Sequence, residues 1–247
     1  SDELMVSICS IGVDSLLTPS AGLGDLSFCG SDSAKIYDTL SHFDKNKRSI
    51  LLNSETDKMP TRLNIIKSVF SFSRETSEPI ILYYAGHGIT INGEFYLVPY
   101  DFDISVAKYT AIPLSLIIDI ISDEIPWAIL LFDACRTNGR LGRSERGRGR
   151  LVRRGLFATG NVCIVSSCGD GENAIEAPAI HGVHSGGIFT HFFVEAVRES
   201  LAAESRVSMG RIFSQLRDQV SSYAVELDGR SQTPQTFGID INDLYLV

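Results

Sequence analysis

The sequence has little of several features that would place it in common classes of protein. Its five cysteines are an odd number for 247 residues, so we expect no disulfide framework and a reducing, cytoplasmic compartment. No apolar run approaches the ~18 residues that a membrane-spanning helix needs. The first residues, S-D-E-L-M, are acidic, so we expect no secretory leader. Basic residues are also in deficit: the net charge of −8 argues against general binding to nucleic acid or to an anionic membrane.

What remains is an ordinary globular composition, with 44% hydrophobic and 21% charged residues. Apolar runs of strand length alternate with segments of helical periodicity, without an internal repeat or a low-complexity linker. This pattern predicts a single α/β domain over residues 1–247, with a mostly parallel sheet of about six strands and helices on both faces. The expected strands are 4–11, 49–52, 80–85, 127–132 and 162–166, and the expected helices are 31–42, 60–70, 113–121, 188–201 and 209–223.

Two of these strands are followed by reactive side chains. The run 127–132 stops before Asp133 and Cys135, and the run 80–85 stops before His87, which lies between two glycines. Because parallel strands present their carboxyl ends at one edge of a sheet, we expect the thiol and the imidazole to share a cleft. A nucleophilic thiol needs such a base. The backbone N–H groups of Gly88 and Cys135 would then form an oxyanion hole. A buried structural cysteine and an unrelated loop histidine remain the alternative.

Two motifs carry a resemblance to a known family. Y-Y-A-G-H-G at 83–88 resembles the histidine motif of the caspase-like cysteine peptidases, and D-A-C-R-T-N-G at 133–139 resembles their cysteine motif in the form found in metacaspases and orthocaspases. Further similar stretches follow in the family's order: 30–34, 96–101, 166–176 and 186–190. The resemblance implies a caspase-like sandwich fold, His87 as general base and Cys135 as nucleophile. It implies peptide-bond hydrolysis through a thioester, without a metal.

The resemblance also bears on specificity. Caspases cut after Asp with arginines in the pocket, whereas metacaspases and orthocaspases cut after Arg or Lys with acids, which match Asp32 and Asp133 here. Paired carboxylates suit a guanidinium, so we expect Arg first and Lys second, with Ser166 as a further substrate-binding residue. Arg136 is expected to point away from the pocket. Asp32 as a plain helix N-cap and Asp133 as a turn former remain alternatives.

An arginine-rich segment follows the nucleophile. Residues 140–154 contain seven arginines and no aromatic residue, so binding to nucleic acid is not favoured. We expect a flexible loop that is cleaved on activation, by the chain itself or by a partner. The candidate cleavage positions are Arg143, Arg146, Arg148, Arg150, Arg153 and Arg154.

We expect no cofactor. The spacing of Cys163, Cys168, His181 and His184 is similar to that of a zinc finger, but Cys163 lies inside an apolar run and the histidine gap is one residue short. Calcium activation is common among metacaspases, yet the positions after Asp101 and Asp103 are not acidic, so the sequence does not support it and an exposed turn is favoured.

The expected partners are a protein substrate with a basic residue before the scissile bond and an activating protein or sensor domain. Two competing hypotheses remain. One is a catalytically silent caspase-like scaffold, and the other is an Asp-directed peptidase of the caspase type.

Overall fold

A computed structural model of the chain describes residues 6–20, 22–121, 123–136, 160–169, 171–203 and 206–246. The side chains of residues 135, 136 and 228 are not described. The arginine-rich segment, and every cleavage position expected within it, lies outside the described residues.

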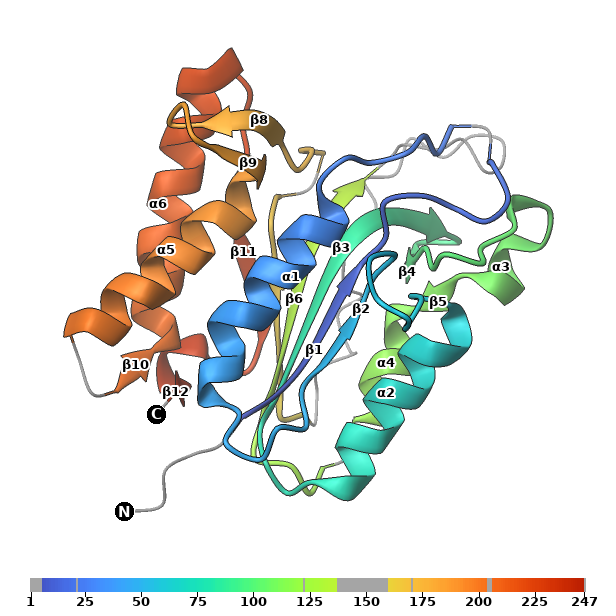
Figure 1. Cartoon of the computed structure of the whole chain (residues 1–247), viewed down its shortest axis with the longest axis horizontal. Helices are drawn as coiled ribbons and strands as arrows, with labels where there is room; N and C mark the ends of the chain where they lie inside the picture. The colour runs from blue at the N-terminus through green and yellow to red at the C-terminus, as the bar shows by residue number, and fades with distance from the viewer. Residues whose placement is uncertain are drawn as a thin grey trace.

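A central sheet organises the molecule (Figure 1). Its main path has the strand order β11-β7-β6-β3-β1-β2, in which neighbouring strands are parallel except at the antiparallel β11 edge. These strands are β1 (Ser7–Gly12), β2 (Ile50–Leu52), β3 (Ile80–Ile91), β6 (Ala128–Arg136), β7 (Val162–Ser166) and β11 (Gln235–Gly238). Two short strands, β4 (Glu94–Leu97) and β5 (Ile112–Pro113), extend the sheet beside the end of β3. The predicted mostly parallel α/β sheet is confirmed.

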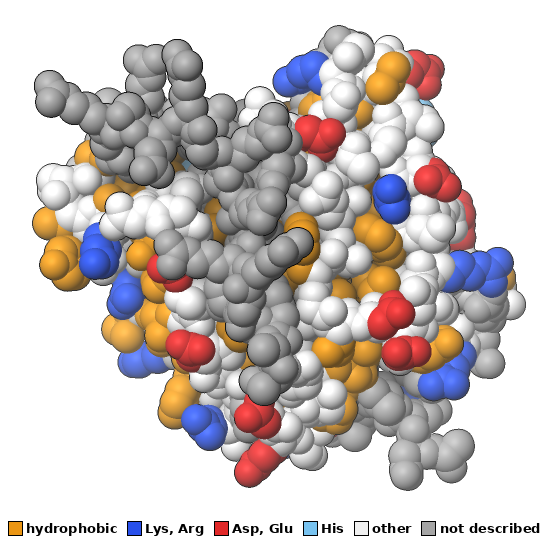
Figure 2. Space-filling model, turned by 180° about the vertical axis from the view of Figure 1, so that it is seen from behind, with side chains coloured by type: hydrophobic (Ala, Val, Ile, Leu, Met, Phe, Trp, Pro, Cys, Tyr) orange, Lys and Arg blue, Asp and Glu red, His pale blue; other side chains and the backbone are white. Residues whose placement is uncertain are grey.

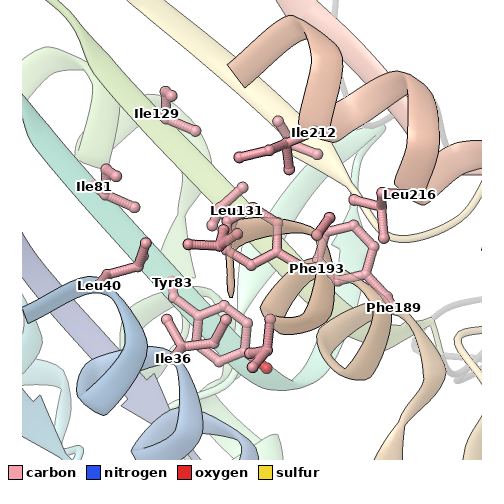
Figure 3. Packing of buried hydrophobic residues seen from close by; sticks show 14 of the residues in the cluster. Ile36, Leu40, Ile81, Tyr83, Ile129, Leu131, Phe189, Phe193, Ile212 and Leu216 are labelled. Carbon is pink, nitrogen blue, oxygen red and sulfur yellow. The ribbon is translucent and has the colours of Figure 1, made fainter. Parts of the chain in front are cut away.

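Helices cover both faces of this sheet, which explains why its strands are continuously apolar. One face packs against α1 (Cys29–Leu40), α5 (Ile188–Ala203) and α6 (Met209–Asp228). Figure 3 shows this core, where Tyr83 and Leu131 of the sheet meet Ile36, Phe193 and Ile212 of the three helices. The other face packs against α2 (Arg62–Glu75) and α4 (Leu114–Ile120).

The two long central strands run further than the sequence predicts. We expected β3 and β6 to end before their polar residues, but β3 continues through His87 to Ile91 and β6 continues through Cys135 to Arg136. Backbone hydrogen bonds extend β3 beyond its apolar residues, because β4 pairs with β3 after the point where β1 ends. The glycines that flank His87 therefore form no turn. Gly86 makes room for its neighbour instead, because a Cβ there would lie 2.6 Å from the Tyr84 hydroxyl oxygen.

Two further expectations concern shorter elements. Helix α1 begins at Cys29 after Phe28, which provides no side-chain cap, so the alternative interpretation of Asp32 as a plain N-cap of this helix is wrong. The stretch 168–187, which the sequence indicates only as polar and glycine-rich, contains a hairpin of β8 (Glu176–Ile180) and β9 (His184–Gly187). The remaining elements are η1 (Ser41–Phe43), η2 (Ile104–Val106), α3 (Ala107–Thr110), β10 (Val207–Ser208), η3 (Ile241–Asp243) and β12 (Tyr245–Leu246).

The surface agrees with the composition. In the view from behind (Figure 2), the acidic and basic side chains of the described residues are scattered and do not gather into one patch. No helix in the described ranges is long and apolar enough to cross a bilayer.

Candidate active site

The two candidate catalytic residues lie side by side in the sheet. His87 of β3 is paired in parallel register with Cys135 of β6. Paired residues of neighbouring parallel strands occupy the same face, and here it is the face covered by α1, α5 and α6, since Tyr83 and Leu131 pair on that face further down the same strands. The register therefore brings together the residues that the sequence analysis singled out.

The His87 ring has one bound and one open nitrogen. Its Nε2 lies 2.6 Å from the carbonyl oxygen of Gly24. A carbonyl only accepts hydrogen bonds, so in the neutral ring Nε2 carries the proton and Nδ1 carries the lone pair. The ring is 5% exposed, and Nδ1 is buried without a hydrogen-bond partner among the described residues. His87 is thus held in the tautomer that a general base requires.

Two carboxylates lie on the same face, beside the start of α5. Asp133 is two residues before Cys135 in β6, and its Oδ2 accepts a 2.8 Å hydrogen bond from the Thr190 hydroxyl. The Oδ2 of Asp32 accepts a 2.7 Å hydrogen bond from the backbone N–H of Gly187. A Cβ on Gly187 would lie 2.6 Å from Asp133 Oδ2 and 3.1 Å from Asp32 Oδ2, so this glycine lies between the two acids and only a missing side chain lets them share the space.

Burial dominates the ionisation of this pair. Loss of solvation, reinforced by the charge of Asp133, raises the pKa of Asp32 to about 7, although Gly187 and Lys35 oppose the shift. Loss of solvation also raises the pKa of Asp133 to about 6, against the hydrogen bonds from Thr190. The donors at the start of α5 favour the anions, yet they do not fully compensate the desolvation. Such a site gains most from a cation that brings its own charge.

A hydroxyl chain behind Asp133 fixes its orientation. The hydroxyls of Tyr83 and Thr190 lie 2.6 Å apart, and both side chains are fully buried. Because Thr190 donates to Asp133, it accepts from Tyr83, and the chain runs from β3 through α5 to β6. Neither residue was singled out from the sequence.

The family model for the caspase domain matches residues 20–244. The chain belongs to the caspase-domain family. That family comprises cysteine peptidases, and the fold described above is theirs. Among solved structures, the crystal structure of protein GSU0716 from Geobacter sulfurreducens matches with a TM-score of 0.63 and 12% identity, over 96% of this chain and 94% of that chain. At this identity the likeness shows the fold alone. No curated protein matches the chain.

One pocket residue expected in this caspase domain is not brought to the aspartates. Ser166 pairs with Phe132, which packs on the opposite face of the sheet, and its hydroxyl donates to the carbonyl of Cys168 at 2.8 Å. The next residue, Ser167, lies on the side of Asp133. Its hydroxyl is buried, and its interaction with the carboxylate lowers the pKa of Asp133. The alternation of a strand was the signal that could have favoured Ser167 over Ser166.

The other candidates outside this face have plainer roles. Asp101 accepts a 2.7 Å hydrogen bond from the N–H of Arg62 at the start of α2, and Asp103 accepts one from the N–H of Ser105. Both are turn and cap contacts, as the favoured interpretation of these acids predicted. The four residues of the zinc-like spacing do not form a group that could hold a metal. The oxyanion role of Gly88, which pairs with Arg136 and Leu97, stays a prediction.

Proposed function

We propose that this caspase domain is a cysteine endopeptidase of the metacaspase or orthocaspase type that cleaves after Arg, and after Lys second. The observation that carries the proposal is the arrangement on one face of the sheet. His87 and Cys135 lie in register on neighbouring strands, and two buried carboxylates lie on the same face: Asp133, two residues before Cys135, and Asp32 of α1.

The chemistry follows from the tautomer of His87. Its Nδ1 takes the proton of the Cys135 thiol, and the thiolate attacks the carbonyl carbon before the scissile bond. The carbonyl oxygen becomes an oxyanion, for which the N–H groups of Gly88 and Cys135 are the proposed donors. When the C–N bond breaks, the imidazolium returns the proton to the leaving amine. Water, deprotonated by His87, then hydrolyses the thioester and restores the thiol.

Specificity follows from Asp32 and Asp133. A guanidinium can hydrogen-bond to both carboxylates in a fixed geometry, and its charge offsets the desolvation that raises the pKa of both acids. A substrate Asp would meet two like charges in the same space. The pocket therefore favours basic residues over acidic ones, which argues against an Asp-directed caspase.

Matched fluorogenic peptides with Arg, Lys or Asp before the scissile bond test the proposal. We expect faster turnover of the Arg peptide than of the Lys peptide and no turnover of the Asp peptide. Cys135→Ala is the inactive control. Cleavage after Asp would refute the assigned specificity. Absence of turnover with all three peptides, after proteolytic treatment of the arginine-rich segment as well, would favour the catalytically silent scaffold.

We further propose that cleavage within residues 143–154, by the chain itself or by an activating partner, switches the enzyme on. The arginines there are of the type that the proposed pocket accepts. Incubating Cys135→Ala protein with catalytic amounts of wild type and weighing the fragments tests this. We expect fragments that end at one of the six arginines in the variant, and an intact variant would contradict cleavage by the chain itself.

A further inference from the structure

We propose that Lys35 of α1 is a positioning residue of this site: its ammonium favours the ionised form of Asp32 and links that residue to β9, so that the two carboxylates together with Lys35 present one net negative charge to one guanidinium. This inference rests on the proposed function, since it assigns a role within the pocket for a basic residue.

The two oxygens of Asp32 have different partners. The Lys35 Nζ lies 3.2 Å from Oδ1 in an ion pair, while Oδ2 accepts from Gly187. Gly187 is also where Asp133 approaches, so Oδ2 is the oxygen on the shared side of the pocket. Lys35 therefore occupies the outer oxygen and leaves the inner one to the pair.

A second contact fixes the ammonium there. Lys35 Nζ donates a 2.5 Å hydrogen bond to the carbonyl oxygen of Ser185 in β9. The lysine thus links α1 to the hairpin that supplies Gly187. Its side chain is 39% exposed whereas that of Asp32 is 3% exposed, so the stem reaches in from the surface and the ammonium lies against the buried carboxylate.

Charge balance explains why a lysine is useful at this position. Two ionised carboxylates buried together repel each other, and without a cation one of them takes up a proton. One ammonium on the outer oxygen leaves a single net negative charge, which a single guanidinium neutralises. A guanidinium would then have to displace a proton from Asp32 in a smaller fraction of the molecules than it would without Lys35.

The other titratable groups around the pair do not replace Lys35. Tyr83 of β3 is a neutral phenol, because burial and the charges of Asp133 and Asp32 raise its pKa well above the ordinary value. Burial and the charge of Asp133 raise the pKa of Glu176 in β8, so it adds no positive charge. His191 of α5, which lies beside His184 of β9, has its pKa lowered by burial, so its ring is mainly neutral at pH 7.

Lys35→Met, which keeps most of the apolar stem, tests the inference, with Lys35→Arg as the conservative rescue. Lys67→Met changes an exposed lysine of α2 and is the matched control. The readouts are the titration of the Asp32 carboxyl carbon by NMR, assigned with Asp32→Asn, and the pH profile of kcat/KM for an Arg peptide.

We expect Lys35→Met to raise the titration midpoint of Asp32 and the acid limb of the profile by about 1 pH unit. At a pH below both midpoints, kcat/KM falls about tenfold, because a shift of one unit is a factor of ten in the ionised fraction. Lys35→Arg returns both midpoints toward wild type, and Lys67→Met leaves them unchanged.

Two results would overturn the inference. Unchanged midpoints and unchanged kcat/KM in Lys35→Met would mean that the lysine has no effect on the carboxylate pair. A gain of kcat/KM at every pH, with unchanged midpoints, would mean that Lys35 competes with the substrate. If wild type cleaves no Arg peptide, the proposed function fails, while the NMR titration still decides the role of Lys35. Lys35→Gln provides the same titration if the Met variant does not fold.

Discussion

Two pairs of aspartates in this chain serve opposite purposes. Asp101 and Asp103 lie at the surface after β4, and each accepts a hydrogen bond from a nearby backbone N–H. Asp32 and Asp133 come from separate elements, α1 and β6, and are buried on either side of Gly187. Hydrogen bonds from Ser105 lower the pKa of Asp103, whereas burial raises the pKa of both buried acids.

The two pairs differ in what surrounds each carboxylate. A surface carboxylate already has water and a local donor, so it has little to gain from a ligand. The two buried carboxylates have the single ammonium of Lys35 as a counter-charge, and under the proposed function a substrate cation would supply the second. The surface pair therefore has its solvation and donors in the free protein, whereas the buried pair has fewer positive than negative charges.

Neutralising the buried pair has the largest expected effect on activity. Asp133→Asn or Asp32→Asn should lower kcat/KM for an Arg peptide about 100- to 1,000-fold, because removing one member of a buried charge pair costs roughly 3 to 4 kcal/mol. Asp101→Asn should stay within about twofold of wild type, because Asp101 is exposed and accepts from the N–H of Arg62 at the start of α2. Equal losses of kcat/KM in both pairs would mean that burial does not distinguish the function of one pair from that of the other.

The buried pair also predicts an unusual dependence of stability on pH. Both folded-state pKa values, about 7 and about 6, lie above the ordinary 3.8. The folded state then binds more protons, so this contribution to stability is full below pH 4 and is lost as the pH rises through 6 and 7. The Asp32→Asn, Asp133→Asn double variant should gain on wild type as the pH rises, with its Tm higher by about 5 °C at pH 8.

Calorimetry of both proteins from pH 5 to pH 8 measures this difference. A constant gap between the two Tm values across that range would mean that the acids do not titrate with raised pKa values. Asp103 should show the opposite dependence, since its pKa is lowered in the folded state and its contribution to stability is lost at acid pH. The Asp103→Asn variant should lack that loss.

Several parts of this contrast could be predicted from the sequence, for a physical reason. The strands of the sheet are apolar runs, which burial on both faces requires, so β3, β6 and β7 were found near their positions. Asp133 and His87 follow directly from those strands. The predicted ends of β3 and β6 were wrong because pairing with an adjacent strand extends each strand through polar residues. The sequence of one segment does not reveal which strands lie beside it.

The contacts that complete the pocket could not be predicted in this way. Asp32 and Gly187 are 155 positions apart, Lys35 and Ser185 are 150 apart, and Thr190 and Asp133 are 57 apart. The β8–β9 hairpin that makes two of these contacts has a proline within β8 and two glycines at the end of β9, so neither helical nor strand periodicity marks it. Glycine at 186 adopts a φ of 137°, and its place beside Asp32 becomes evident only in the folded chain.

The hydroxyl chain behind Asp133 predicts an effect of intermediate size. Thr190→Val removes the donor to Asp133 and leaves the Tyr83 hydroxyl without its partner, so we expect a loss of about 1 to 3 kcal/mol in the free energy of unfolding. The pKa of Asp133 should rise further, and kcat/KM for an Arg peptide should fall about tenfold at pH 6 and less at pH 8.

Thr39→Val is the matched control for that substitution. Thr39 is also a buried threonine, but its hydroxyl has no hydrogen-bond partner among the described residues. Replacing it should leave both stability and the pH profile of kcat/KM close to wild type or raise stability slightly. Similar losses in the two variants would show that the loss does not depend on the hydrogen bond from Thr190 to the carboxylate.

The smallest expected effect belongs to the surface pair and concerns stability alone. Asp101→Ala removes the acceptor for the N–H of Arg62, and the first turn of α2 loses a contact of the capping type, worth about 1 kcal/mol. Chemical denaturation should show this loss with an unchanged slope, while kcat/KM for Arg and Lys peptides stays at the wild-type value. The Thr61 hydroxyl accepts from the N–H of Asn64 at the same helix end, so Thr61→Ala should give a loss of stability of similar size. A change in Arg specificity in either variant would mean that the start of α2 communicates with the buried acids, and the two aspartate pairs would then no longer be separate.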